Sequence, residues 1–260
     1  MGEAVRIGVA GALGRMGRAV EALMDGRQDV RLAARLDRPG ATDADAHVVP
    51  LTDFCAAAEV CDVIVDFSTG AAGAALATAA AMRGGPALVI GATGFSAVED
   101  ARVRDAAHRI AIVRSGNFSL GVNLLAALVE EAARRLPAAD WDIEILEAHH
   151  RRKIDAPSGT ALLLGEAAAR GRDEALDPQA LAGRAGITGE RPRGGVGFAS
   201  LRGGGIIGEH AVLFAGEEET ITLSHSARDR SLFARGALAA ALWVQGKPPG
   251  LYGMREVLGF

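Results

Sequence analysis

Cysteine is almost absent from the sequence, which has only Cys55 and Cys61 in 260 residues. They lie in the stretch DFCAAAEVCD, without the spacing of metal ligands and without a neighbouring pair of histidines, so we expect no metal site. A reducing cytoplasm would not maintain a disulfide between them. We therefore predict that both are small, buried side chains.

The sequence also lacks an excess of either charge and any long apolar run. Lys and Arg number 28 against 32 Asp and Glu, and a formal net charge of −4 gives no overall basic field for nucleic acid or anionic lipid. Apolar stretches such as AALATAAAM are far shorter than the roughly 20 residues of a membrane span. The start, MGEAVRIGVAG, shows no secretory signal. We expect a soluble cytoplasmic protein that binds neither nucleic acid nor membrane.

In the first 120 residues, short β-branched runs alternate with alanine-rich segments. Helices are predicted over 14–26 and 71–85, with a further helix before the last of the strands. The predicted strands are 4–10, 29–37, 61–68, 87–94 and 111–119. Strands that alternate with helices of roughly 10 to 15 residues are typical of a doubly wound, Rossmann-type parallel sheet.

The pattern changes near residues 119 to 121. A helix is predicted over 121–136, followed by a strand over 141–150, a helix over 160–171 and a polar, glycine-rich loop over 183–198. The core stripe predicted for the first of these helices is Val122, Leu125, Leu128, Val129, Ala132 and Leu136. Strands predicted over 196–202, 206–215 and 219–227 then follow one another directly. This order is typical of an α+β domain.

The final segment, 231–260, is apolar, and we expect it to be helical and to pack on the first domain. The sequence therefore predicts a dinucleotide-binding domain over 1–120, completed by 230–260. It predicts a second domain over 121–229.

A glycine-rich turn, GVAGALGRMG, lies between the first predicted strand and helix, with Gly11 and Gly14 at its centre. Residues without Cβ allow a tight turn whose backbone N–H groups can bind a pyrophosphate, although the strict G-x-G-x-x-G spacing is not kept. The next strand ends at Asp37, whose carboxylate can accept from adenosine ribose hydroxyls, and Arg38 can pair with a 2′-phosphate. This pattern predicts NADH or NADPH binding. The alternative is a glycine-rich turn with an incidental surface Asp-Arg pair.

Two further predicted strands end in GATG and SGNF. Ligands of open α/β sheets bind outside the carboxyl ends of the strands, where small side chains leave room for a flat ring and Asn117 can provide an amide contact. The small residues there are Gly91, Ala92, Thr93, Ser115 and Gly116. Ordinary strand-to-helix turns are the alternative.

The run EAHHRRKIDAPSGT, residues 147–160, concentrates basic side chains in a chain of negative net charge. Its end opens a predicted helix, where the N–H groups of Gly159 and Thr160 and the Thr160 hydroxyl can form an anion site. Lys153 and the histidines add positive charge. We predict a small acidic substrate and a proton supplied by a histidine or lysine. The alternative is a solvated basic loop followed by a plain helix cap.

The same run closely resembles E-x-H-H-x-x-K-x-D-A-P-S-G-T, the signature of the dihydrodipicolinate reductase family, now described as 4-hydroxy-tetrahydrodipicolinate reductases of bacterial and plant lysine biosynthesis. Other similar segments are GALGRMG, DFS, GATGF, NFSLGVN, GFASLRGGGIIGEH and ALWVQGKPPGLYGMREVL. The resemblance implies a dinucleotide-binding domain completed by the C-terminal tail, a central domain on an open mixed sheet, and a homotetramer.

The resemblance also implies roles for individual residues. His149 resembles the proton donor and Lys153 a second acid, while His150, Gly159 and Thr160 resemble substrate contacts. The matching cofactor positions are Gly11, Ala12, Leu13, Gly14, Arg15, Met16, Asp37, Arg38, Gly91, Ala92, Thr93, Ser115, Gly116, Asn117 and Phe118. In the implied reaction, NADH or NADPH reduces ring C4 of a cyclic imine dicarboxylate left by loss of water, and the enamine is protonated.

Two positions depart from the family pattern: Gly70 replaces a usual proline, and Ala92 replaces a common threonine. Another Rossmann enzyme acting on a small carboxylate, such as an amino-acid dehydrogenase, would keep the glycine turn but has no need for HHxxKxDAPSGT. A dinucleotide-sensing regulator would need a DNA-reading module, and the sequence shows no helix-turn-helix or basic recognition helix.

Overall fold

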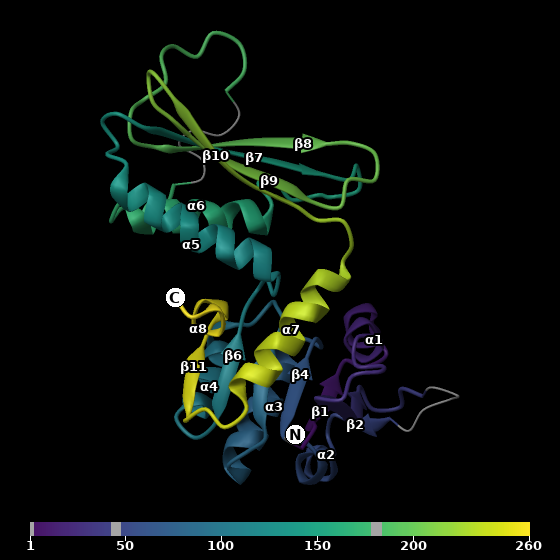
Figure 1. Cartoon of the computed structure of the whole chain (residues 1–260). Coiled ribbons are helices and arrows are strands. Elements are labelled where there is room, and N and C mark those ends of the chain that lie inside the picture. The colour runs from purple at the N-terminus through teal and green to yellow at the C-terminus, as the bar shows by residue number, and fades with distance from the viewer. Residues whose placement is uncertain (1–2, 43–47, 178–183) are drawn as a thin grey trace. The chain divides into compact units, whose positions relative to one another are not determined.

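The computed structural model describes residues 3–42, 48–177 and 184–260, and the chain folds into two compact units (Figure 1). The parallel-sheet unit joins Met1–Leu120 with Ser231–Phe260, and the mixed-sheet unit is Gly121–Arg230. Within the described ranges, no helix has both the length and the apolar character that crossing a membrane requires.

The parallel-sheet unit is built on a seven-stranded sheet in the order β11-β6-β5-β4-β1-β2-β3, and every neighbouring pair is parallel. The strands are β1 Val5–Ala10, β2 Val30–Asp37, β3 Val49–Pro50, β4 Val63–Asp66, β5 Ala87–Ile90, β6 Ala111–Arg114 and β11 Gly250–Tyr252. The central strands are buried on both faces, which explains their nearly continuous apolar sequences. The predicted Rossmann-type sheet is confirmed.

Helices cover both faces of this sheet. In β4, Val63 and Val65 belong to the core cluster shared with α1 (Arg15–Ala22), α7 (Ser231–Val244) and α8 (Met254–Leu258). Ile64 points to the opposite face and packs in the cluster of α2 (Phe54–Val60), α3 (Gly70–Arg83) and α4 (Ala97–Ala107). Each face of the sheet therefore has its own apolar core, as the alternation of strand side chains requires.

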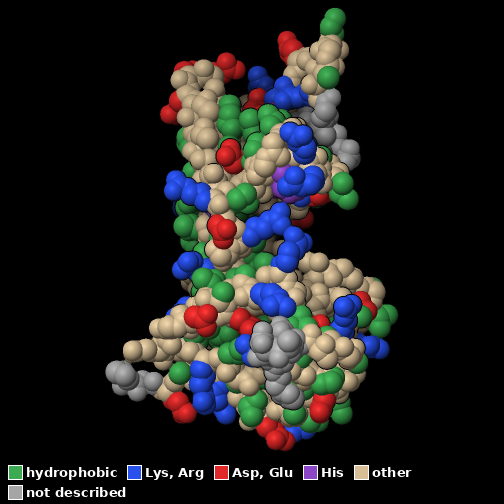
Figure 2. All heavy atoms as spheres, turned by 90° about the vertical axis from the view of Figure 1, so that its right-hand side faces the viewer, with side chains coloured by type: hydrophobic (Ala, Val, Ile, Leu, Met, Phe, Trp, Pro, Cys, Tyr) green, Lys and Arg blue, Asp and Glu red, His purple; other side chains and the backbone are tan. Residues whose placement is uncertain are grey.

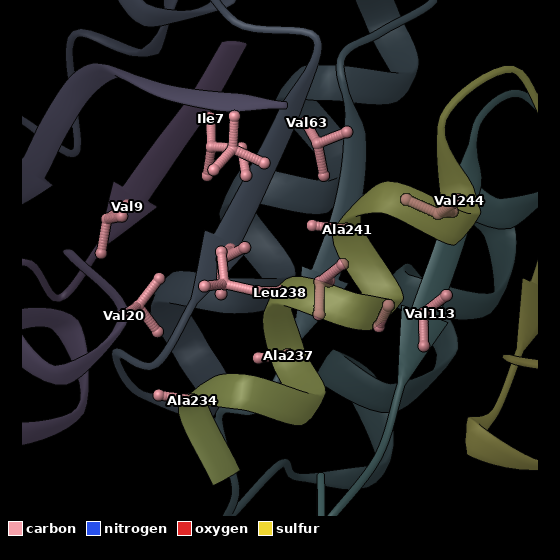
Figure 3. Close-up of a cluster of buried hydrophobic side chains, with 14 of the residues drawn as sticks. Ile7, Val9, Val20, Val63, Val113, Ala234, Ala237, Leu238, Ala241 and Val244 are labelled. Atoms are coloured by element: carbon pink, nitrogen blue, oxygen red, sulfur yellow. The ribbon is translucent and has the colours of Figure 1, made fainter. Parts of the chain in front are cut away.

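Helix α7 lies on the sheet through small side chains, and Figure 3 shows Ala234, Ala237 and Ala241 beside Leu238 at this contact. A Cβ added at Gly236 would lie 1.7 Å from the carbonyl oxygen of Phe118. The α7 backbone therefore rests directly against the segment that follows β6.

The segment 231–260 is not helical throughout, which corrects the sequence prediction. Helix α7 ends at Val244, Gly246 has a φ of +72°, and the following Pro248 and Pro249 cannot continue a helix. Gly250–Tyr252 then pairs in parallel with β6 as the edge strand β11. Helix α1 is also shorter than predicted, since it ends at Ala22 in a tight turn with i→i−3 bonds from Leu23 and Met24.

The mixed-sheet unit has a four-stranded sheet in the order β10-β9-β7-β8. Its strands are β7 Asp142–His149, β8 Val196–Arg202, β9 Glu209–Ala215 and β10 Thr220–Ser226, and only the β7–β8 pair is parallel. Helix α6 (Gly159–Gly171) connects that parallel pair and, with α5 (Leu120–Arg135), packs on one face of the sheet. The predicted open mixed sheet is confirmed.

Two side chains that the sequence predicts to be buried are exposed in the structure. Cys61 is buried as expected, but Cys55 is exposed, and its sulfur accepts a hydrogen bond from Arg83. Leu128 of the predicted α5 stripe is 45% exposed, whereas Val122, Leu125 and Val129 of the same stripe are buried as predicted. Of the predicted loop 183–198, residue 183 lies outside the described residues.

Asp66 is a fully buried carboxyl group at the end of β4. Its Oδ1 accepts hydrogen bonds from the backbone N–H and the hydroxyl of Ser68, while Oδ2 has no partner among the described residues. Burial raises the pKa of Asp66 to about 6, and the Ser68 bonds oppose that shift only in part.

Replacing Gly236 with alanine should lower the free energy of unfolding by roughly 1 to 3 kcal/mol, because the new methyl group would overlap the Phe118 carbonyl. Helix propensity alone predicts a gain of roughly 0.5 to 1 kcal/mol. Urea unfolding of Gly236→Ala measures the difference, with Arg235→Ala at an exposed position of the same helix as the control. If Gly236→Ala were as stable as wild type or more stable, that would contradict the close contact.

Asp66 should make the protein less stable as pH rises from about 4 to about 6, because its folded pKa of about 6 exceeds the ordinary 3.8. Below both pKa values, Asp66 is protonated in the folded and in the unfolded protein and does not change the stability. Above both, the folded protein must bury a charged carboxylate, which destabilises it relative to the unfolded protein. Urea unfolding of Asp66→Asn against wild type should therefore show a stability difference that moves by roughly 3 kcal/mol in favour of the variant across this window. A difference independent of pH would mean that Asp66 titrates normally.

Candidate active site

The predicted cofactor segments all follow the carboxyl ends of parallel strands. Gly11 follows β1, Asp37 ends β2, Gly91 follows β5 and Ser115 follows β6. Strands β2 and β4 lie on opposite sides of β1, so the sheet has its switch point between β1 and β4, beside Gly11. This is where ligands bind in open α/β sheets.

The glycine turn is built from close backbone approaches. Gly11 has a φ of +72°, and a Cβ there would lie 2.9 Å from the carbonyl oxygen of Phe67. A Cβ on Gly17, in the first turns of α1, would lie 2.4 Å from the carbonyl oxygen of Gly11. Helix α1 begins at Arg15 after Gly14, which has no side chain to cap it. The turn therefore presents backbone at a helix N-terminus, as a pyrophosphate site needs.

Asp37 is fixed beside this turn. Its Oδ2 accepts the backbone N–H of Leu13 at 2.9 Å, and its Oδ1 accepts that of Arg38 at 2.8 Å. The side chain of Arg38 is exposed. The structure thus brings Asp37 against the turn formed by Gly11, Ala12 and Leu13, while Arg15 and Met16 start the helix.

The segments after β5 and β6 share a surface depression of about 480 Å³, and Ala92, Thr93, Ser115 and Gly116 line it. Phe95 and Arg114 line it as well, with the guanidinium 4.1 Å from the ring centroid. This depression unites most of the predicted residues from the two segments.

Three predicted cofactor residues have contacts within the unit instead. Gly91 packs against the Phe67 ring, since a Cβ there would lie 2.3 Å from a ring carbon. Asn117 accepts the Ser119 N–H through Oδ1 at 2.9 Å. Phe118 is only 2% exposed, and its ring meets that of Phe67 edge-on, so almost none of this residue is accessible to a ligand.

A close backbone contact explains why glycine occupies position 70, where the family usually has proline. It is the first residue of α3, and a Cβ there would lie 2.9 Å from the carbonyl oxygen of Gly94. Glycine at this position lets α3 begin close against the segment that follows β5.

In the mixed-sheet unit, the apolar inner face ends in a row of polar side chains. Glu147 of β7 is opposite Ser200 of β8 and His210 of β9, and His225 of β10 continues the row. Further along β7, His149 is opposite Arg202. Residues opposite one another share a face, so the register gathers these groups at one end of the sheet, beside α6.

Glu147 is the most connected member of this polar row. Both of its oxygens accept from Arg202 at 2.7 Å, Oε1 also accepts the N–H of Ser158 at 3.2 Å, and Oε2 lies 2.6 Å from Nδ1 of His149. Burial by itself would raise the pKa of Glu147, but hydrogen bonds from Arg202, His149 and Ser200 outweigh it and lower the pKa to about 2. Glu147 is therefore a carboxylate at neutral pH.

An ionised Glu147 determines how His149 is protonated. A carboxylate only accepts hydrogen bonds, so Nδ1 of His149 carries a proton and donates it to Glu147. Nε2 is then the ring atom that can exchange a proton, and a Cβ added at Gly208 would come within 3.2 Å of it. The neighbouring His210 lies with its Nε2 3.0 Å from the Ser158 hydroxyl oxygen, and burial lowers the pKa of His210 to about 4.

The helix expected to bind an anion begins next to these groups. Ser158 caps α6 by accepting the N–H of Ala161 at 3.1 Å, and Gly159 and Thr160 are the first helical residues. Nζ of Lys153 lies 2.7 Å from a carboxylate oxygen of Asp155.

His150 follows β7, and its pKa is lowered by burial and by the charges of Arg152 and Arg230. Figure 2 shows Lys and Arg side chains around the histidine that is visible on this unit. The structure therefore gathers His149, Ser158 and the start of α6 around Glu147, with the basic residues of the 147–160 run close by in the chain.

Sequence reasoning gave no role to four members of this site: Glu147, Ser158, Arg202 and His210. All four lie in segments that resemble the family, and strand alternation places Glu147 on the same face as His149. Their meeting could not be read from the sequence, because it depends on the register between β7, β8 and β9.

Known proteins similar to this chain cover its full length. A family model described as "Dihydrodipicolinate reductase, N-terminus" matches residues 5–118, and one described as "Dihydrodipicolinate reductase, C-terminus" matches residues 121–258. A 4-hydroxy-tetrahydrodipicolinate reductase of Caulobacter vibrioides is 60% identical, over 100% of this chain and 99% of that protein. The corresponding protein of Rhizobium rhizogenes is 52% identical, over 99% and 97%.

A solved structure, "Dipicolinate bound Dihydrodipicolinate reductase from Paenisporosarcina sp. TG-14", superimposes with a TM-score of 0.80 at 24% identity, over 97% of this chain and 99% of that chain. This likeness concerns the fold. A diaminopimelate dehydrogenase of C. glutamicum superimposes less well, with a TM-score of 0.55 at 18% identity, over 98% and 93%. Because both parts of the family model match and full-length relatives are 50% identical or more, the resemblance is confirmed and this chain belongs to the dihydrodipicolinate reductase family.

Proposed function

We propose that this oxidoreductase reduces 4-hydroxy-tetrahydrodipicolinate to tetrahydrodipicolinate with NADH or NADPH, in the diaminopimelate route to lysine. The observation that carries the proposal is the placement of His149, with its proton-exchanging Nε2, beside the N-terminus of α6 in the run that bears the family signature. The relatives that match the full chain carry the name of this reductase. We further propose that the enzyme works in the cytoplasm.

The parallel-sheet unit has the features that a dinucleotide needs. The turn from Gly11 to Met16 would hold the pyrophosphate, because close backbone packing at Gly11 and Gly17 leaves no space for side chains. Asp37 and Arg38 would hold the adenosine ribose, and the residues after β5 and β6 would hold the nicotinamide end. When bound, the nicotinamide cofactor supplies the hydride.

The mixed-sheet unit would bind the substrate and deliver the proton. Gly159 and Thr160 would bind a carboxylate at the start of α6, and Lys153 and His150 would contribute the adjacent basic groups. His149 would give the proton from Nε2 to the reduced ring, with Lys153 as the second acid. The relative whose name includes bound dipicolinate supports a planar dicarboxylate as the class of ligand.

A homotetramer is part of the proposal. The face of the mixed sheet opposite α5 and α6 exposes Leu146 at 43% and Leu201 at 58%, and β8 and β10 are edge strands. Apolar side chains and strand edges that have no partner strand among the described residues together favour association with further copies of the chain.

A coupled assay tests the proposed reaction. Dihydrodipicolinate synthase supplies the unstable substrate from pyruvate and aspartate semialdehyde, and the oxidation of NADH or NADPH is followed by absorbance. We expect rapid oxidation that requires both precursors. No oxidation with either cofactor, from protein shown to be folded, would contradict the proposal.

His149→Gln and Lys153→Ala should each lower kcat by roughly 10² to 10⁴, the range for loss of an acid or base. Circular dichroism should show both variants folded. Arg151→Ala, at an exposed position of the same run, is the matched control and should keep wild-type kcat. Wild-type turnover in either active-site variant would remove that residue from proton transfer.

Arg38→Ala should raise KM for NADPH by roughly 10-fold and change KM for NADH little, because only NADPH carries the 2′-phosphate that an arginine pairs with. Steady-state kinetics with both cofactors measure the ratio. Equal losses for the two cofactors would exclude Arg38 from phosphate recognition.

A further inference from the structure

We propose that Glu147 is a positioning residue that holds the imidazole of His149 and the N-terminus of α6 in their working arrangement. This inference rests on the proposed function, because it assigns Glu147 to the two groups that would protonate and bind the substrate. It concerns contacts within the mixed-sheet unit only.

Each of the two oxygens of Glu147 contacts one of these two groups. Oε2 lies 2.6 Å from Nδ1 of His149, and Oε1 accepts the N–H of Ser158 at 3.2 Å. Arg202 donates to both oxygens at 2.7 Å and thereby fixes the plane of the carboxylate. One rigid group therefore sets both the ring orientation and the start of α6.

Arg202 extends this connection to the loop that precedes α6. Its Nη2 also donates to the backbone carbonyl of Asp155 at 2.7 Å. The loop that carries Lys153 is thus hydrogen-bonded to β8 through Arg202. The end of the same loop, at Ser158, is hydrogen-bonded to β7 through Glu147. Both ends of the proposed anion site depend on the Glu147–Arg202 pair.

A purely structural role would not require these particular partners. The Glu147 side chain is 1% exposed and follows Ile143 and Ile145 on the same face of β7, where an apolar residue would continue the core. The buried carboxylate found there instead makes its bonds to a ring nitrogen of His149 and to the N–H of Ser158, the cap of α6. Because the carboxylate accepts from Nδ1, the ring exchanges protons at Nε2, as in other pairs of an acid and a histidine.

The decisive variant is Glu147→Gln, which removes the charge while keeping the shape. Glu144→Gln is the matched control, since Glu144 is on the same strand and also pairs with arginines, Arg184 and Arg191. We expect kcat of Glu147→Gln to fall at least roughly 100-fold and its affinity for dipicolinate, measured by calorimetry, to fall roughly 10-fold. The control should stay within twofold of wild type in both.

Nitrogen-15 NMR of the His149 ring, at a pH where the ring is neutral, gives a readout that does not depend on turnover. The wild-type ring should carry its proton on Nδ1, and in Glu147→Gln a substantial share should move to Nε2. An unchanged ring, or kcat and dipicolinate affinity equal to those of the control, would overturn the proposal.

A second variant covers the case in which Glu147→Gln fails to fold. Glu147→Asp keeps the charge but is one methylene shorter, so it cannot reach all three partners, and kcat should fall at least roughly 10-fold. Wild-type kcat in this variant would also overturn the proposal. If the wild-type enzyme failed to reduce the substrate at all, the proposed function would fail, while the NMR and dipicolinate results would still decide the role of Glu147.

Discussion

The ion pair between the buried Glu147 and the partly exposed Arg202 is the interaction on which the mixed-sheet unit's site depends. It connects the ends of two parallel strands, β7 and β8, and reaches the loop and helix between them through Asp155 and Ser158. A buried charge is unfavourable unless its partners satisfy it, and here arginine, histidine and a backbone N–H do so. The same bonds that stabilise the charge also fix the orientation of His149.

The parallel-sheet unit depends on a different constraint, which is the absence of side chains at backbone contacts. Gly11 and Gly17 shape the turn before α1, and Gly236 lets α7 rest on the carbonyl of Phe118. Through that contact the end of the chain supports the segment from Ser115 to Phe118. The C-terminal residues are therefore part of the structure that would hold the cofactor, although they are distant in sequence.

The sequence predicted the fold class and the family, because β-branched runs, glycine turns and the 147–160 run are local signals. Long-range pairing was harder to predict. β11 was mistaken for helix because three residues become a strand only by pairing with β6, and Arg202 and His210 join Glu147 only through sheet register. Local apolar character also overestimated the burial of Cys55 and Leu128. The roles of His149, Lys153 and the cofactor residues stay predictions.

The measurement that tests the central role of Glu147 most directly is the pKa of its own carboxyl group. Carbon-13 NMR of labelled glutamate carboxyl groups, with the Glu147 signal assigned through Glu147→Gln, follows that group as the pH is lowered. The account predicts no titration of Glu147 down to the lowest pH at which the protein stays folded, because its pKa is lowered to about 2. A midpoint at or above the ordinary value of 4.5 would show that Glu147 is not the charged centre of the site.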